Sequence, residues 1–355
     1  MWGRGATTLG RKLTCAGLLA AAALGGGPGA AGLSAQGGAE LPDGLEGTLI
    51  VLNKGAATAT FLDLASGRRL AVLPTGDGPH ELVVSADGRW AVATDYGARS
   101  EGHTLTVLDV ARLRVARTIE LGEYRRPHGI AFLPGDSLVV VTSEAAGAVV
   151  LVHVHRGEVV GTAPTGAGGS HMLALTGDGS RIFTSNGRGN SVSEIDVAAR
   201  RFEGEFAVPA RPEAIAVTRA GDEVWVGSNA EGSLTVVDPA TGRTERAASG
   251  FGWPYRILFT PDERTVLVPD LRGHVLRFFD ASSRRETGRL ELPGGGPQSM
   301  AFYRDPGVVF LSLSAQGRAA VIDVERRAVL GYYGTGPRPD GIGYSPLRPQ
   351  AAGTR

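Results

Sequence analysis

Three of the seven histidines in the chain stand in a pattern that can do chemistry. His80, His128 and His171 each open an apolar run, and they lie 48 and 43 residues apart. Neutral imidazole is a good ligand for zinc and copper, and three of them around an open position can bind a metal or activate water. The sequence therefore predicts that these side chains bind a divalent transition metal, Zn or Cu, or else an anionic ligand.

The histidine spacing belongs to a repeat that runs through most of the chain. The equivalent positions, called anchors below, are His80, His128, His171, Glu213, Tyr255, Gln298 and Asp340. After an anchor come two apolar runs joined by a turn such as Asp87-Gly88, which is a strong hairpin signal. The later steps are 42 or 43 residues, and a fixed period of this size indicates one structural unit repeated along the chain.

Each repeat predicts four antiparallel strands, and the two ends of the chain are incomplete in complementary ways. Asp340 opens a first strand, residues 342–344, with no second, third or fourth strand after it. The three missing strands are supplied by residues 49–53, 58–62 and 70–74. Closing the ring removes exposed sheet edges. We therefore predict an all-β fold, a single seven-bladed β-propeller of four-stranded antiparallel blades over residues 47–346, with the N- and C-terminal strands sharing one blade.

The propeller geometry gathers polar residues at one mouth of the central channel. The residue 15 positions after an anchor ends the second strand, so it returns to the same face as the anchor. The candidate ligand-binding residues are His80, His128, His171, Glu213, Tyr255, Arg256, Gln298, Asp340, Asp95, Glu144 and Asn186. By strand alternation Arg256 points away from Tyr255, where it can hold a carboxylate or phosphate. In the alternative interpretation, these polar groups only bond to backbone and seal the channel.

The N-terminus is typical of a targeting segment. Arg4, Arg11 and Lys12 precede an apolar run at 13–24 that is too short to span a bilayer, and small residues follow it. We expect residues 1–35 to be a Sec-type signal peptide, which predicts a periplasmic or secreted protein. Residues 36–46 are expected to form a flexible linker and residues 347–355 a C-terminal tail. The only cysteine, Cys15, lies in the signal peptide, so no disulfide is expected.

Composition excludes several classes of function. Thirty-six basic residues balance 36 acidic ones, so nothing indicates a nucleic-acid partner. No second apolar run is long enough for a membrane span in the mature chain. The sequence contains no Gly-x-Ser-x-Gly, His-Glu-x-x-His or phosphate-loop motif. We expect a monomer with a small ligand or a protein partner at the channel mouth.

The repeat resembles a known family. The anchors, the Asp-Gly turns and strand ends such as Ile182-Phe183-Thr184-Ser185-Asn186 are similar to the YVTN repeat of YncE-like and lactonase-like propellers, over roughly residues 47–346. The resemblance implies an exported, non-enzymatic binding or scaffold protein. Its alternative is a lactonase-like hydrolase in which a histidine or Glu213 acts as general base. A third and weaker implication is a partner subunit in a redox or quinoprotein system. We favour binding, because no catalytic constellation is recognisable.

Overall fold

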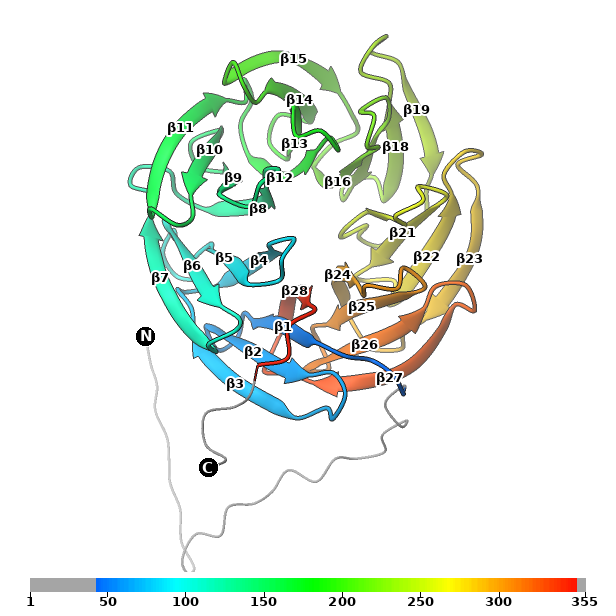
Figure 1. Cartoon of the computed structure of the whole chain (residues 1–355). Coiled ribbons are helices and arrows are strands. Elements are labelled where there is room, and N and C mark those ends of the chain that lie inside the picture. The colour runs from blue at the N-terminus through cyan, green and yellow to red at the C-terminus, as the bar shows by residue number, and fades with distance from the viewer. Residues whose placement is uncertain (1–42, 350–355) are drawn as a thin grey trace, which may run out of the picture. The chain divides into compact units, whose positions relative to one another are not determined.

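The chain forms a closed ring of seven four-stranded antiparallel sheets (Figure 1). The structure, a computed structural model, describes residues 43–349, and all of their regular elements are strands. The all-β, seven-bladed propeller predicted from the repeat is therefore confirmed. We number the blades from the first anchor, so that blades 1 to 6 begin at strands β4, β8, β12, β16, β20 and β24, and blade 7 combines β28 with β1, β2 and β3.

The strands have the following bounds. Blade 1 contains β4 (Pro79–Val84), β5 (Trp90–Asp95), β6 (Thr104–Asp109) and β7 (Arg114–Glu120). Blade 2 contains β8 (Pro127–Phe132), β9 (Leu138–Ser143), β10 (Ala148–His153) and β11 (Glu158–Pro164). Blade 3 contains β12 (Ser170–Leu175), β13 (Arg181–Asn186), β14 (Ser191–Asp196) and β15 (Arg201–Ala207). Blade 4 contains β16 (Pro212–Val217), β17 (Val224–Ser228), β18 (Ser233–Val237) and β19 (Thr244–Ala248).

The remaining three blades follow the same plan. Blade 5 contains β20 (Leu258–Phe259), β21 (Thr265–Asp270), β22 (Val275–Asp280) and β23 (Glu286–Glu291). Blade 6 contains β24 (Pro297–Phe302), β25 (Val308–Leu313), β26 (Arg318–Asp323) and β27 (Ala328–Gly334). Blade 7 contains β28 (Pro339–Ser345), β1 (Thr48–Asn53), β2 (Thr58–Asp63) and β3 (Arg69–Pro74).

The ring closes through antiparallel pairing of the two ends of the chain. Thr48 of β1 lies opposite Ser345 of β28, so the chain's last strand completes the blade that its first strands begin. This is the closure predicted from the split repeat. Leu45 and Leu347, just outside the predicted boundaries, also pack on the apolar core. The predicted signal peptide, most of the linker and the end of the tail lie outside the described residues.

The core consists of seven apolar clusters, one between each pair of neighbouring blades. Between blades 1 and 2, for example, Val92 and Leu105 pack with Val139 and Val150. Burial of apolar surface therefore stabilises every blade interface separately, at about 25 cal/mol per Å². Because the clusters lie between the sheets, the channel at the centre of the ring is left to polar side chains.

The first strand of a blade is bulged where it reaches the channel. In blade 1, Pro79 pairs with Asp95 and Leu82 pairs with Ala93, so His80 and Glu81 together face a single residue of β5. The same register shift follows the first paired residue in blades 2, 3, 4 and 6, and it recurs where β28 pairs with β1. A bulge places two successive residues opposite one and turns the strand. It therefore brings both the anchor and the next residue to the channel.

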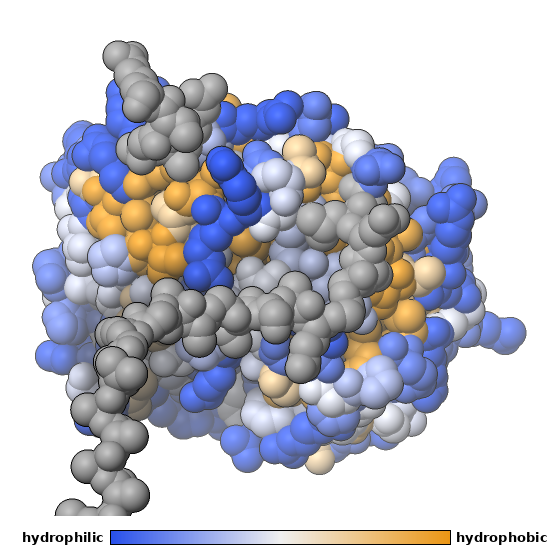
Figure 2. All heavy atoms as spheres, turned by 90° about the horizontal axis from the view of Figure 1, so that it is seen from below, coloured by the Kyte–Doolittle hydropathy of each residue, from blue (hydrophilic) through white to orange (hydrophobic). Residues whose placement is uncertain are grey.

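The outer surface is mixed. Seen from below, apolar side chains appear on the edge of the disc among hydrophilic ones (Figure 2). Val72 on β3, at 46% exposure, is the one large hydrophobic residue among residues 43–349 that is classed as exposed. No helix capable of crossing a membrane occurs in this part of the chain.

Candidate functional site

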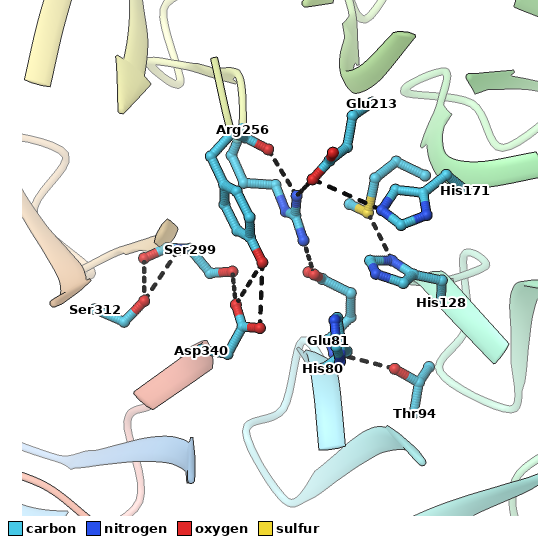
Figure 3. Close-up of polar contacts among 12 residues, drawn as sticks. His80, Glu81, Thr94, His128, His171, Glu213, Arg256, Ser299, Ser312 and Asp340 are labelled. Carbon is cyan, nitrogen blue, oxygen red and sulfur yellow. Dashed lines mark hydrogen bonds and ion pairs between the residues drawn. The ribbon is translucent and has the colours of Figure 1, made fainter. Parts of the chain in front are cut away.

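The bulged first strands bring most of the predicted residues together at the channel (Figure 3). Hydroxyl groups on the second strands hold the bulges in shape. Thr94 accepts a hydrogen bond from the Glu81 backbone N–H at 3.0 Å, and Ser312 does the same for Ser299 at 3.0 Å. The bulge N–H groups are thus satisfied without a ladder partner. The side chains beside them are left to reach across the channel.

Arg256 lies at the centre of this arrangement. It is 7% exposed, it forms a short ion pair with Glu81, and its Nη1 lies 3.7 Å from Oε1 of Glu213. The expectation that Arg256 points away from Tyr255 is wrong, because its guanidinium lies 4.2 Å from the Tyr255 ring centroid and donates to the Tyr255 carbonyl at 2.6 Å. Strand alternation does not apply here, since β20 begins only at Leu258.

Asp340 anchors a second group on the other side of the channel. Its carboxylate accepts hydrogen bonds from Tyr255 Oη at 3.2 Å, from Ser299 Oγ at 3.4 Å and from Lys54 Nζ at 3.3 Å. Burial alone would raise the pKa of Asp340, but the positive charges of Lys54 and Arg256 outweigh it and hold that pKa below its usual range. Asp340 is therefore ionised at neutral pH.

His80 and His128 are neutral at physiological pH. Burial lowers the pKa of His80 to about 3, with a further lowering contribution from Lys54, whose Nζ lies 2.5 Å from His80 Nε2. His128 is 1% exposed, and burial followed by the charge of His171 lowers its pKa well below the usual value. Its Nδ1 lies 3.2 Å from the sulfur of Met172, while its buried Nε2 has no hydrogen-bond partner among the described residues.

His171 has the opposite charge state. Its Nδ1 lies 3.0 Å from Glu144 and its Nε2 lies 3.7 Å from Glu213. Burial works against protonation, but the hydrogen bond to Glu144 and the negative charge of Glu213 prevail and raise the pKa of His171 to about 9. His171 is therefore a cation at neutral pH, and both of its nitrogens are engaged. Glu144 is held in turn by Tyr96, whose Oη donates to it at 2.8 Å.

The rings of the three histidines pack against one another, His80 edge-on to His128, and do not converge on a metal position. The ring centroids of His128 and His171 are 3.7 Å apart with an angle of 34° between the rings, and those of His80 and His128 are 4.6 Å apart. Within residues 43–349, no group of three or more His, Cys, Asp or Glu side chains is arranged to hold a metal ion. The geometry therefore does not support a zinc or copper site on these residues.

Three predicted residues lie apart from this network. Asp95 points into its own blade, where it accepts hydrogen bonds from the Gly76 N–H, Thr104 and Thr106. Asn186 occupies the equivalent position in blade 3, where its side-chain amide donates hydrogen bonds to Ser191 and Ser193. Gln298 is buried at the start of β24. Asp95 and Asn186 thus hold a loop and two strands of their own blade together.

Sequence reasoning missed several channel residues, and a regular signal could have found them. Glu81, the partner of Arg256, directly follows an anchor. Lys54 and Tyr96 follow the residues that end second strands, Asn53 and Asp95. In both cases the residue one place later in the chain faces the channel. The bulge and the turn after the second strand produce this shift, and Glu144, which also follows a strand end, fits the same rule.

A pocket of about 300 Å³ opens at the channel mouth and is lined by residues of blades 1 to 5. His171 and Glu213 are at its floor, and Trp253 donates from its indole Nε1 to Glu213 at 3.2 Å. The complete lining is Tyr96, Glu144, Gly169, His171, Gly187, Arg188, Arg211, Pro212, Glu213, Asn229, Ala230, Trp253 and Arg272. Because its floor carries fixed and compensated charges, the pocket is pre-organised to recognise a polar ligand.

The fold and the channel define the class of the chain, a seven-bladed β-propeller with an ion-paired channel mouth. Two solved structures share the fold: Kuenenia stuttgartiensis hydrazine synthase, with a TM-score of 0.67, 18% identity and 78% of this chain and 92% of that chain covered, and a functionally unknown protein from Desulfotomaculum acetoxidans DSM 771, with a TM-score of 0.69, 17% identity and coverage of 84% and 99%. At these identities the likeness concerns the fold alone.

Part of the chain also matches a known family. Residues 134–247 match the family described as YNCE-like beta-propeller. No curated protein matches the chain significantly. The chain is a seven-bladed β-propeller, and about a third of it is similar to the YNCE-like family, in agreement with the resemblance of its repeat.

Proposed function

We propose that this chain is an exported, non-enzymatic binding protein that holds a small ligand in the pocket at its channel mouth. The observation that carries the proposal is the 300 Å³ pocket with a pre-organised ionic floor. Pockets of this size, with a few fixed polar groups, are typical of small-molecule sites rather than of protein interfaces. Export is proposed from the N-terminal pattern of residues 1–35.

The charge states at the floor favour binding over hydrolysis. A general base must be unprotonated and must reach the substrate. His171 is protonated, since its pKa is raised to about 9, and both of its nitrogens already face carboxylates. His128 is neutral but buried, and His80 is buried against Lys54. The carboxylate of Glu213 accepts from Asn229 and Trp253, so it is committed as well.

Filling the pocket tests the proposal. Gly187 lines the pocket, and a Cβ added there would meet nothing closer than the Pro212 carbonyl oxygen at 3.5 Å. Gly187→Leu should therefore fold normally and occupy the site. Gly204→Leu is the matched control, because a Cβ at Gly204 on β15 meets nothing within 4 Å.

The assay is thermal stabilisation of the three proteins by a panel of organic acids, amino acids, sugars and sugar lactones. We expect at least one compound to raise the Tm of the wild type and Gly204→Leu but not of Gly187→Leu. A stabilisation pattern that Gly187→Leu leaves unchanged would count against the pocket. The hydrolase alternative would instead be established if the wild type hydrolysed a lactone and a correctly folded His171→Gln variant did not.

A further inference from the structure

We infer that the ligand of this pocket is a small multivalent oxyanion, and that Arg188, Arg211 and Arg272 hold it. The inference rests on the binding function proposed above and adds the ligand's chemical class. All three arginines line the pocket, and they come from three separate connections. Arg188 lies in the β13–β14 turn, Arg211 directly precedes β16, and Arg272 lies in the β21–β22 turn.

The repeat itself shows that the fold does not require these arginines. Arg188 and Arg272 occupy the same place in their blades, 17 residues after the anchors His171 and Tyr255. In the other blades with the same four-residue turn, the corresponding residue is alanine in blades 2, 4 and 6 (Ala145, Ala230 and Ala315) and glycine in blade 7 (Gly55). Since alanine serves the same turn elsewhere, the two arginines need another explanation.

Arg211 is present against a backbone preference. Its φ is 57°, in the left-handed region that favours glycine. The equivalent residues two places before the anchors are glycines with positive φ in blades 1, 3 and 6, namely Gly78, Gly169 and Gly296, and arginines with positive φ in blades 2 and 7, namely Arg126 and Arg338. Arginine thus recurs at this position, and of the three arginines only Arg211 lines the pocket.

The three guanidinium groups retain N–H donors that can bind a ligand. Within residues 43–349, no carboxylate forms an ion pair with any of them. One Nη of Arg188 donates to the Glu144 carbonyl at 3.2 Å, and Arg272 lies over the Trp253 ring at 4.5 Å from its centroid. Stacking fixes the plane of a guanidinium and leaves its edge free for a bidentate bond to a carboxylate or phosphate.

The charge of the pocket agrees with an anionic ligand. Four cationic side chains line it, the three arginines and His171, against two anionic ones, Glu144 and Glu213. Both carboxylates face His171, and Glu213 also faces Arg256, so neither neutralises the arginines. The chain as a whole has no net charge, which makes this local excess of two positive charges a property of the pocket. Its volume of about 300 Å³ suits a di- or tricarboxylate or a small phosphate ester.

Binding of defined anions to the purified protein tests the inference. The probes are tricarballylate, succinate and acetate for carboxylate valence, glycerol 2-phosphate for phosphate, and neutral succinamide as the uncharged counterpart of succinate. Affinities are measured by calorimetry at low ionic strength. We expect tricarballylate to bind more tightly than succinate, succinate more tightly than acetate, and succinamide not to bind. The glycerol 2-phosphate arm shows whether phosphate or carboxylate is preferred.

The variants copy residues that the other blades already contain. Arg211→Gly should weaken the binding of the best probe about fivefold, and Arg188→Ala/Arg211→Gly/Arg272→Ala about 100-fold, as expected for exposed charge pairs that act together. Arg338→Gly is the matched control. It removes a charge from the equivalent left-handed position of blade 7, outside the pocket, and should change affinity less than twofold.

The outcomes separate this inference from the proposed function. If Gly187→Leu abolishes binding while the triple variant binds as the wild type does, the pocket is a ligand site but the arginines do not hold the ligand. Equal binding of succinamide and succinate, or binding only of uncharged compounds, overturns the anionic class alone. If neither Gly187→Leu nor the triple variant alters the binding of any compound, both the site and its ligand class are wrong.

Discussion

Removing the cation between Glu144 and Glu213 should change how the stability of the propeller depends on pH. The pKa of His171 is raised from 6.5 to about 9 in the folded protein. The stabilisation that comes from this raised pKa is complete below pH 6.5. It is lost as the pH rises toward 9, where the folded protein also releases the proton. The shift corresponds to about 3 kcal/mol of unfolding free energy.

Urea denaturation between pH 6 and pH 9.5 measures this contribution. The wild type should lose about 3 kcal/mol across the window from pH 6.5 to 9, whereas His171→Gln should be less stable at pH 6.5 and should show no such loss. The two curves should meet near pH 9.5. His103→Gln, which removes a histidine outside the channel network, controls for the loss of an imidazole and should follow the wild type.

Glu144→Gln provides a second, independent check. Removing one of the two carboxylates lowers the pKa of His171 in the folded protein, so the alkaline loss should end at a lower pH and be smaller than in the wild type. Direct titration of the His171 ring by NMR should show the same order of pKa values. Parallel stability curves for the wild type and His171→Gln, or a ring that titrates near 6.5, would refute the ion-paired floor.

Two further predictions concern groups inside the fold. Asp95→Ala should cost about 2 kcal/mol of unfolding free energy, because the variant leaves the loop N–H and two threonine hydroxyls without their acceptor. Burial raises the pKa of Asp95 to about 6, so Asp95→Asn should gain stability relative to the wild type as the pH rises from 3.8 to about 6, by about 3 kcal/mol in denaturant titrations. Arg256→Met should cost about 3–5 kcal/mol by leaving Glu81 buried without its cation. Arg256→Met/Glu81→Leu should cost less than the single change, and additive losses in the double-mutant cycle would contradict a coupled pair.

The sequence was sufficient for the fold because a propeller repeats its local signals. Each repeat carries its own hairpin turn and its own apolar strands, and every copy packs on its neighbours in the same way. The split copy at the ends then determined closure, with Thr48 opposite Ser345. The hairpin and strand signals are local in the sequence, and closure follows from counting the strands at the two ends. Neither inference requires knowing which distant residues meet in the folded chain.

The site was harder to predict because its contacts cross the channel. Glu81 and Arg256 are 175 residues apart in the chain and meet only in the closed ring. The three histidines have the composition of a metal site, but charged residues of other blades contact nitrogens of His80 and His171, and Nδ1 of His128 lies against the sulfur of Met172. The bulges and the turns after the second strands also introduce a one-residue shift. The residue that faces the channel is therefore the one after the expected strand end.

Because the blades repeat, residues at equivalent positions can be compared within this single sequence. Where different residues at one position make the same bonds, the position is structural. Asn53 accepts from the Gly336 N–H and donates to Thr58 and Thr60, which is the pattern that Asp95 shows as an acceptor. Where the blades differ at one position, as Arg188 and Arg272 differ from the alanines of blades 2, 4 and 6, the fold does not require the particular side chain. This comparison supports the proposal that the arginines at the channel mouth, rather than the three histidines, hold the ligand.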